Sequence, residues 1–240
     1  MVNKLTLSSF ISKYHLNGLH PTVKWRIKDN SLIVYASTPG RYCKVHLKKF
    51  ELEDCELGIF DTNQLEKLVS IMNGVVIISL EKNKDLITKI KLADNNFDLV
   101  YSLADPLVIG KVKWVEDPEN WDIELNIEPE EIVHLLKAKT ALSEIKNVVL
   151  TSTKNIDGDL TSEFVFGEEM GHSNNIKYQK PGIISRDEIY IPLEANHFRD
   201  ILNSNKDMDL CKLKATASGI VKINFISDEI ETEYYIARSE

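Results

Sequence analysis

The chain begins with hydrophobic residues at a helical spacing. Within residues 5–16 they recur at intervals of three and four: Leu7, Phe10, Ile11 and Tyr14. Residues spaced in this way share one face of an α-helix, and the Asn17-Gly18 pair that follows is a common helix stop. The pattern predicts an amphipathic helix over residues 5–16.

The rest of the first half alternates between strand-like runs and turn signals. Runs rich in Val, Ile, Tyr and Phe predict antiparallel strands within residues 22–57 and at 75–81, 86–92 and 97–103. A second helix is expected to begin at Asp61 or Thr62, because both residue types cap helix N-termini. Its hydrophobic face would comprise Leu65, Leu68, Val69 and Met72, and Asn73-Gly74 would end it.

The periodic pattern lapses over residues 104–121. This stretch contains Asp105-Pro106, Gly110 and Asp117-Pro118, which are turn and loop signals. We therefore expect an N-terminal domain at residues 1–103, an extended connector at 104–121 and a C-terminal domain at 122–240.

The second half repeats the plan of the first. A strand is expected at residues 123–127, and Glu128-Pro129 predicts a helix with Pro in its first turn. Further strands are expected at 147–152, 160–167, 176–180, 188–191, 210–217, 219–226 and 231–238, with a fourth helix at 194–203. Each half thus has the order helix, strands, helix, strands, which predicts an α+β fold of two similar domains.

The helical stripes also recur at nearly constant shifts. The second and fourth helices align at a shift of 133 residues: Leu65, Leu68 and Val69 with Phe198, Ile201 and Leu202, and Asp61 with Glu194. The first and third align at a shift of 122: Phe10, Ile11 and Tyr14 with Ile132, Val133 and Leu136. The difference between the two shifts predicts an insertion within residues 155–182.

Composition narrows the range of functions. The 240 residues are 43% hydrophobic and 28% charged, and no apolar run approaches the length needed to cross a bilayer. We expect a soluble, non-secreted, cytoplasmic protein without membrane contact. The net charge of −8 argues against tight static binding to nucleic acid, so any DNA contact requires a local basic surface.

The sequence contains few signals of cofactor or metal chemistry. Cys43, Cys55 and Cys211 are widely spaced and lack the pattern of a metal site, which indicates reduced, structural thiols. No phosphate-binding GxxxxGK[ST] motif is present, so the chain is not expected to hydrolyse ATP itself. We expect neither a cofactor nor a bound metal.

Several segments resemble the sliding clamps of DNA replication, most closely those of T-even-type bacteriophages. Residues 50–65 (FELEDCELGIFDTNQL) resemble their acidic strand, short apolar strand and Asp-begun leucine helix. Residues 101–106 (YSLADP) are similar to the end of their first domain, and 127–137 (IEPEEIVHLLK) to the first helix of their second. Residues 234–237 (YYIA) resemble the last strand of clamps generally, whereas 155–182 and 114–121 depart from the phage pattern.

The resemblance implies the DNA clamp fold, in which helices line the hole of a ring and sheets form its outside. It implies a processivity factor that encircles double-stranded DNA, tethers the replicative DNA polymerase and is loaded by an ATP-dependent clamp loader. Such a protein needs no active site, so we expect no enzymatic activity. If the protein is viral, it would act in the cytoplasm of a bacterial host.

The helix faces opposite the hydrophobic stripes would then face DNA. They carry a modest excess of cationic candidates on or near the four helices: Lys13, Lys67, His134, Lys137, Lys139, Lys146 and Arg199. Such a face attracts phosphates without base-specific hydrogen bonds, which allows sliding. A solvated helix surface would account for any one of these residues taken alone.

Helix dimensions suggest the number of subunits. Twelve helices packed about 10 Å apart enclose a circle of about 38 Å between axes and an opening of about 28 Å. Eight helices would leave only about 15 Å, too narrow for a hydrated duplex. Four helices per chain therefore predict a homotrimer with head-to-tail interfaces.

The resemblance also implies an apolar pocket where peptides of the polymerase and the clamp loader dock. The matching positions lie in the first half, the connector and the last strand: Val45, Leu47, Leu107, Val108, Ile109, Tyr235, Ile236 and Ala237. Exposed apolar patches often mark such sites. Packing in the core or at a sheet edge would equally explain these residues, so that alternative stays open.

Two other function classes remain open. A β-rich structural or assembly protein of a virion would share this length, acidity and strand content. A metal-dependent nuclease would explain the acidic cluster of Glu51, Glu53, Asp54 and Glu56, because carboxylates on one strand face can hold Mg²⁺. The cluster lacks an evident general base, which argues against catalysis.

Overall fold

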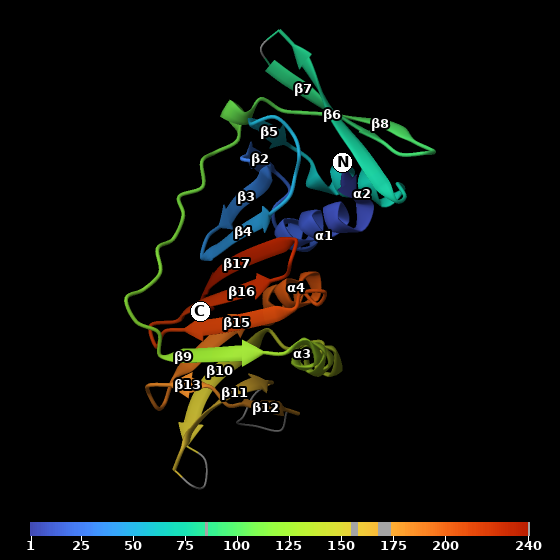
Figure 1. Cartoon of the computed structure of the whole chain (residues 1–240). Coiled ribbons are helices and arrows are strands. Elements are labelled where there is room, and N and C mark those ends of the chain that lie inside the picture. The colour runs from blue at the N-terminus through green and yellow to red at the C-terminus, as the bar shows by residue number, and fades with distance from the viewer. Residues whose placement is uncertain (85, 155–157, 168–173, 240) are drawn as a thin grey trace. The chain divides into compact units, whose positions relative to one another are not determined.

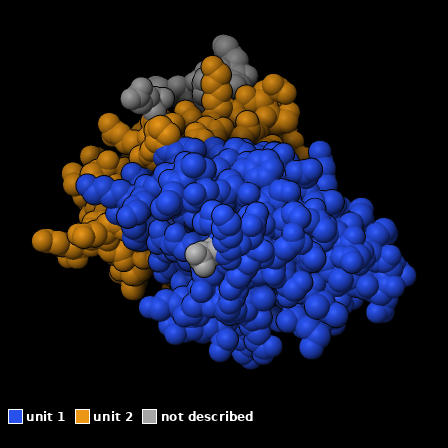
Figure 2. Space-filling model, turned by 90° about the horizontal axis from the view of Figure 1, so that it is seen from above, with its two compact units in different colours: residues 1–38, 42–114, 228–232 blue, residues 39–41, 115–227, 233–240 orange. Residues whose placement is uncertain are grey.

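The computed structural model describes residues 1–84, 86–154, 158–167 and 174–239. It divides into two compact units, which Figure 2 shows in different colours. Unit 1 contains residues 1–38, 42–114 and 228–232, and unit 2 contains residues 39–41, 115–227 and 233–240. The division after residue 114 falls inside the stretch expected to be a connector.

Two capped helices belong to unit 1, α1 (Lys4–His15) and α2 (Thr62–Ser70). The Asn3 side chain accepts a hydrogen bond from Leu5 N, and Asp61 accepts one from Gln64 N at 3.0 Å. These caps satisfy N–H groups that lack partners at a helix start. The two helices pack against each other (Figure 1). Both helices and the Asp61 cap confirm the sequence predictions.

The strands of unit 1 form two groups with antiparallel pairing. The first is the sheet β1-β6-β7-β8, with bounds β1 (Val2–Asn3), β6 (Val75–Asn83), β7 (Leu86–Ala93) and β8 (Asp98–Ser102). The second has the order β4-β3-β2-β5, with bounds β2 (Val23–Lys28), β3 (Ser31–Thr38), β4 (Arg41–Leu47) and β5 (Cys55–Ile59). A short 3₁₀ turn, η1 (Leu16–Gly18), follows α1, and another, η2 (Pro106–Val108), opens the connector.

Aromatic rings from α1 and β2 fill the core of unit 1. Phe10 packs edge-on against both Tyr14 and Trp25, and Trp25 Nε1 donates a hydrogen bond to Tyr14 Oη at 3.1 Å. This bond gives the buried indole N–H the partner that it needs. The hydrophobic stripe predicted for residues 5–16 is therefore the face that α1 turns to the core.

Unit 2 repeats the helix pair as α3 (Pro129–Ala141) and α4 (Ala195–Ser204). A capping box begins α3, in which Glu128 N donates to Glu131 Oε2 at 2.8 Å. The Glu194 side chain caps α4 by accepting from Asn196 N and His197 N. Asp61 and Glu194 thus cap equivalent helices, as the 133-residue shift predicted. Helices α3 and α4 pack against each other (Figure 1).

The strands of unit 2 also form two groups. The first has the order β12-β11-β10-β14, with bounds β10 (Asn147–Lys154), β11 (Leu160–Phe166), β12 (Ile176–Lys180) and β14 (Tyr190–Glu194). The second has the order β13-β9-β15-β16-β17, with bounds β9 (Ile123–Ile127), β13 (Ile183–Ile184), β15 (Leu210–Ala215), β16 (Ile220–Ile226) and β17 (Ile230–Ala237). Among the strands that the structure describes, the sequence pattern missed β1 and β13, which have two residues each.

The core of unit 2 again joins helix and strands. Phe198 of α4 stacks on Phe164 of β11, and Asn205 Nδ2 donates to Tyr234 Oη at 2.9 Å. Of the predicted insertion at 155–182, the described part forms β11 and β12, while 155–157 and 168–173 lie outside the described residues. None of the helices in the described part is long and apolar enough to span a membrane.

Candidate functional site

Five of the seven cationic candidates lie at least partly exposed on or beside the helices. Lys67 is exposed on α2, His134 and Lys137 on α3, and Lys146 just after α3. Arg199 is half-buried on α4, and its guanidinium donates to Asp200 Oδ1 at 2.7 Å. Each unit therefore presents positive charge on its helix pair. These residues can attract phosphates, although Asp200 offsets part of the charge of Arg199.

The other two candidates, Lys13 and Lys139, are buried. Lys13 is 0% exposed and donates to Ser9 Oγ, while Lys139 is 4% exposed and donates to Ser143 O. Lys13 follows Phe10 by three positions and Lys139 follows Leu135 by four, so both fall on the hydrophobic stripe of their helix. Their aliphatic stems pack inward and their amines bond within the same segment. The expectation that they lie on the exposed face is therefore corrected.

A network of charges fixes the start of α3 to strand β12. Lys180 Nζ lies 2.6 Å from Glu131 Oε2, and Tyr178 Oη donates to Glu131 Oε1 at 3.0 Å. Burial raises the pKa of Glu131, but the hydrogen bonds from Lys180, the Glu128 N–H and Tyr178 outweigh it, so the pKa is lowered. The carboxylate consequently stays charged at neutral pH. It anchors the first turn of α3, the helix that carries His134 and Lys137, to β12.

Val45 and Leu47 of β4 are core residues. They are 0% and 2% exposed, whereas their neighbours Tyr42, Lys44 and His46 point to the opposite face of the strand. Side chains alternate between the two faces of a strand, so a shift of one residue exchanges core and surface. Neither Val45 nor Leu47 is among the described residues that line the cavity between the connector and β2.

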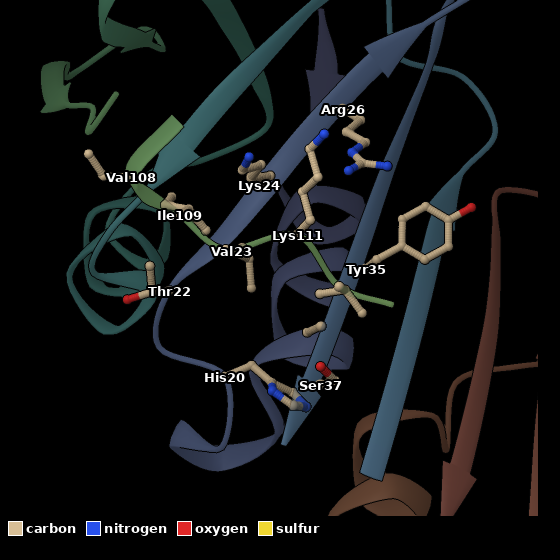
Figure 3. A pocket seen from close by; sticks show the side chains of 13 residues that line it. His20, Thr22, Val23, Lys24, Arg26, Tyr35, Ser37, Val108, Ile109 and Lys111 are labelled. Carbon is tan, nitrogen blue, oxygen red and sulfur yellow. The ribbon is translucent and has the colours of Figure 1, made fainter. Parts of the chain in front are cut away.

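The connector does form a cavity with unit 1, which we call the connector groove. Its volume is about 350 Å³, and Figure 3 shows the side chains that line it. The lining comes from the segment before β2, from β2, from β3 and from the connector: His20, Thr22, Val23, Lys24, Arg26, Tyr35, Ala36, Ser37, Val108, Ile109, Gly110, Lys111 and Val112. Of the eight predicted docking residues, Val108 and Ile109 belong to this groove.

Leu107 and Val108 are the most exposed of the predicted docking residues. They are 88% and 75% exposed at the 3₁₀ turn η2, and Asp105 caps this turn by accepting from Leu107 N. Two large apolar side chains that lie next to each other in solvent are a feature of protein-binding surfaces. These two residues are therefore well placed to contact another protein.

Tyr235, Ile236 and Ala237 lie on β17 in unit 2, where Ala237 is exposed and the other two are buried. The Tyr235 hydroxyl donates to Asp117, and Lys222 Nζ lies 2.9 Å from Asp117 Oδ2. Burial raises the pKa of Asp117, but these two partners outweigh it and lower the pKa. Burial and the hydrogen bond to Asp117 raise the pKa of Tyr235 to about 12. This cluster attaches the second part of the connector to unit 2.

Sequence reasoning missed the basic side of the connector groove. Lys24 and Arg26 alternate on β2 with the buried Val23, Trp25 and Ile27, a signal that was present in the sequence. Lys111 lies far away along the chain, and no spacing rule connects it with β2. Only the folded connector brings these cations into one cavity.

The acidic cluster is occupied by contacts within the chain. Glu53 pairs with Lys82 at 2.7 Å, Glu56 pairs with Arg26 at 3.2 Å, and Asp54 accepts from Asp29 N. Within the described ranges, no group of three or more His, Cys, Asp and Glu side chains is placed to hold a metal ion.

The three cysteines form no disulfide. Burial raises the pKa of each thiol, to about 11 for Cys55. All three therefore remain protonated at neutral pH.

No protein-family model matches the chain, and no curated protein matches it in sequence. Solved structures do match it from end to end. PCNA of A. fulgidus, in a structure titled as bound to the C-terminal region of FEN-1, is 12% identical with a TM-score of 0.79, covering 100% of this chain and 97% of that chain. Proliferating Cellular Nuclear Antigen from Entamoeba histolytica is 14% identical with a TM-score of 0.74, covering 99% and 96%.

A third structure, PCNA from Thermococcus kodakaraensis, is 14% identical with a TM-score of 0.75, covering 100% of this chain and 98% of that chain. At these identities the likeness concerns the fold. Its coverage of nearly the whole of each chain agrees with the α+β architecture of paired helices and antiparallel sheets. The chain therefore has the fold of the DNA sliding clamps.

Proposed function

We propose that this protein is a sliding clamp that encircles double-stranded DNA and acts as a processivity factor. The observation that carries this proposal is the clamp fold itself, in which each unit exposes cationic side chains on its helix pair. These are Lys67 in unit 1, and Lys137 and Arg199 in unit 2, with the exposed imidazole of His134 also on α3. In a protein with a net charge of −8 they provide a weak local attraction for phosphates. Enclosure, and not affinity, would keep the protein on DNA.

The protein would form a closed ring from three copies joined head to tail. Among the described strands, β8 pairs only with β7, and β12 pairs only with β11, so each unit has an open strand edge. Open edges readily pair with another chain. Pairing β8 of one copy with β12 of the next would join two different surfaces head to tail. Such an interface produces a closed ring when successive copies are related by a rotation that returns to the first copy.

Partner proteins would dock on the connector. The A. fulgidus PCNA structure is titled as holding the C-terminal region of FEN-1, which supports a peptide-binding role for this fold. In this chain the exposed Leu107 and Val108, together with Ile109, are the candidate apolar contacts. Through them the clamp would tether the replicative DNA polymerase and meet the ATP-dependent clamp loader. The clamp would enclose the DNA and hold partner proteins beside it, without catalysing a reaction of its own.

The finer assignments remain predictions of the sequence. They comprise the resemblance to T-even-type phage clamps, action in a bacterial host cytoplasm, and the domain bounds 1–103, 104–121 and 122–240. A virion structural protein is the alternative, but it would not require cationic helix faces in both units.

The proposal is tested by retention on circular and linear DNA. The protein is loaded with a matching clamp loader and ATP onto nicked plasmid, and half of the sample is linearised. We expect the protein to elute with the circular DNA on gel filtration and to leave the linear DNA through its ends. Equal retention on both forms would identify a conventional DNA binder and contradict the proposal.

A further inference from the structure

We propose that the connector groove binds an acidic, extended segment of a partner protein through Lys24, Arg26 and Lys111. The inference rests on the proposed function in one respect: it takes the molecule bound in the groove to be a partner protein. It specifies the charge of the occupant: carboxylate side chains flanked by apolar ones.

The groove is basic although the chain is acidic. Its thirteen lining residues include Lys24, Arg26, Lys111 and His20 but neither Asp nor Glu. The whole chain has 37 acidic against 29 basic residues, so a lining without any acid departs from its composition. A surface of this kind selects partners of opposite charge and raises their rate of association.

Lys24 gives the strongest local argument. The residue is only 9% exposed, and no described residue accepts a hydrogen bond from its amine or forms an ion pair with it. Its stem is buried, but the amine is not among the fully buried unpaired polar atoms of the described residues, so it reaches solvent and can take an acceptor. Figure 3 shows the Lys24 amine among the groups lining the groove, where a bound carboxylate would supply that acceptor.

Arg26 and Lys111 add charge from two different elements. Arg26 pairs with Glu56 of β5 at 3.2 Å and lies over the Tyr35 ring at 5.6 Å, while Lys111 extends from the connector toward Arg26 (Figure 3). The Arg26–Glu56 pair is about half exposed, so it is weak, and Arg has donors left for a second carboxylate. Glu56 itself is absent from the lining.

The shape and the remaining lining favour a short peptide segment. A volume of about 350 Å³ is at the low end for a binding pocket and suits a few side chains of an extended segment. Val23, Val108, Ile109 and Val112 form apolar lining beside the cations, which suits side chains that alternate between acidic and apolar. A nucleic acid would bring phosphates but would leave the valine and isoleucine contacts unused.

The test is fluorescence anisotropy with two labelled peptides, SGELEVEGS and its uncharged match SGQLQVQGS. We expect the glutamate peptide to bind about tenfold more tightly than the glutamine peptide, and Lys24→Met and Lys111→Met each to weaken it about tenfold. Lys113→Met is the matched control, because Lys113 is exposed on the same connector and does not line the groove. Thermal denaturation followed by circular dichroism checks that all variants are folded.

Several results would overturn the inference. They are equal affinity for the two peptides, an equal loss in Lys113→Met, or an oligo(dT) strand that displaces the glutamate peptide and binds more tightly than it does. Retention on circular DNA is measured in parallel with the wild type. If the wild type does not stay on circular DNA but still prefers the glutamate peptide, the clamp function alone is refuted. If it stays on circular DNA but does not prefer the glutamate peptide, the acidic-segment site alone is refuted.

Discussion

Ala104 N donates a hydrogen bond to Gly58 O at 3.0 Å, and these two residues form an isolated antiparallel bridge. The bridge attaches the first residue of the connector to β5. A Cβ on Gly58 would overlap the Ala104 carbonyl and approach Ile109 Cδ1 to 3.2 Å. The absence of a side chain at Gly58 therefore allows the connector to lie close enough to β5 to complete the groove.

Replacing Gly58 by alanine should separate the connector from β5. We expect Gly58→Ala to lower the free energy of unfolding by about 1–3 kcal/mol, since the added methyl meets backbone atoms that cannot move freely. Urea denaturation measures this change. Gly110→Ala is the control, because a Cβ there meets nothing within 4 Å. Equal stabilities of the two variants would show that the close approach is unimportant.

The open edge of β8 should be required for ring assembly. Leu103 N donates to Thr88 O, and N–H direction alternates along an antiparallel strand, so Val100 N points away from β7. Val100→Pro removes this edge N–H and leaves the β7–β8 ladder intact. We expect light scattering at micromolar concentration to give the mass of three chains for the wild type and of one chain for the variant.

Val100→Ala is the matched control for edge pairing, since it keeps the N–H and removes most of the side chain. It should remain a trimer. A trimer in Val100→Pro would exclude the β8 edge as the interface, and a wild-type monomer or dimer would exclude the trimer.

The exposed helix cations should control the salt dependence of DNA binding. We expect replacing Lys67, Lys137, Lys146 and Arg199 together by Gln to reduce the slope of log affinity against log salt by up to about 4. Anisotropy with a short duplex at several salt concentrations measures the slope. The control replaces Lys28, Lys49, Lys84 and Lys113, which are exposed outside the helices and carry the same total charge. Equal slopes in both variants would indicate a nonspecific charge effect.

The Asp117–Tyr235 hydrogen bond should stabilise unit 2 in a pH-dependent way. We expect Tyr235→Phe to lower the free energy of unfolding by about 1 kcal/mol at pH 7. The folded pKa of Asp117 is lowered, so its contribution is present above its unfolded pKa near 4 and is lost as the pH falls through the folded value.

Asp117→Asn tests the same linkage. The stability difference between this variant and the wild type should be largest at pH 6–7 and should shrink below about pH 4. Urea denaturation at each pH gives the two curves. A difference independent of pH would show that the charge of Asp117 contributes nothing.

The exposed apolar turn should be required for partner docking. Val108→Asp places a charge on a side chain that is 75% exposed, so the fold should persist while polymerase tethering falls by about tenfold or more. A primer-extension processivity assay measures the effect. Ile183→Asp, at a residue 72% exposed on β13, is the control and should retain full processivity. Equal processivity of all three proteins would exclude η2 from the docking surface.

Local patterns in the sequence were sufficient for the helices and for most strands. The stripe of Leu65 and Val69, the cap Asp61 and its counterpart Glu194 depend on spacings of four residues or fewer, so they can be recognised without a tertiary structure. Their recurrence 133 residues later identified the duplication. The burial of Lys13 and Lys139 was also implied by helical spacing, and it was misjudged because charge was given more weight than position.

The groove, in contrast, depended on contacts between distant segments. The sequence left open whether Val45 and Leu47 belong to a docking surface or to the core, and only the folded strand decides that their face is buried. Lys24 and Lys111 are 87 positions apart in the numbering, and they line one groove because the connector returns to unit 1, where Gly58 allows its close approach to β5. Periodicity encodes which residues share a face of one element. Which elements share a cavity is decided by packing across the chain, because that packing depends on all the side chains at once.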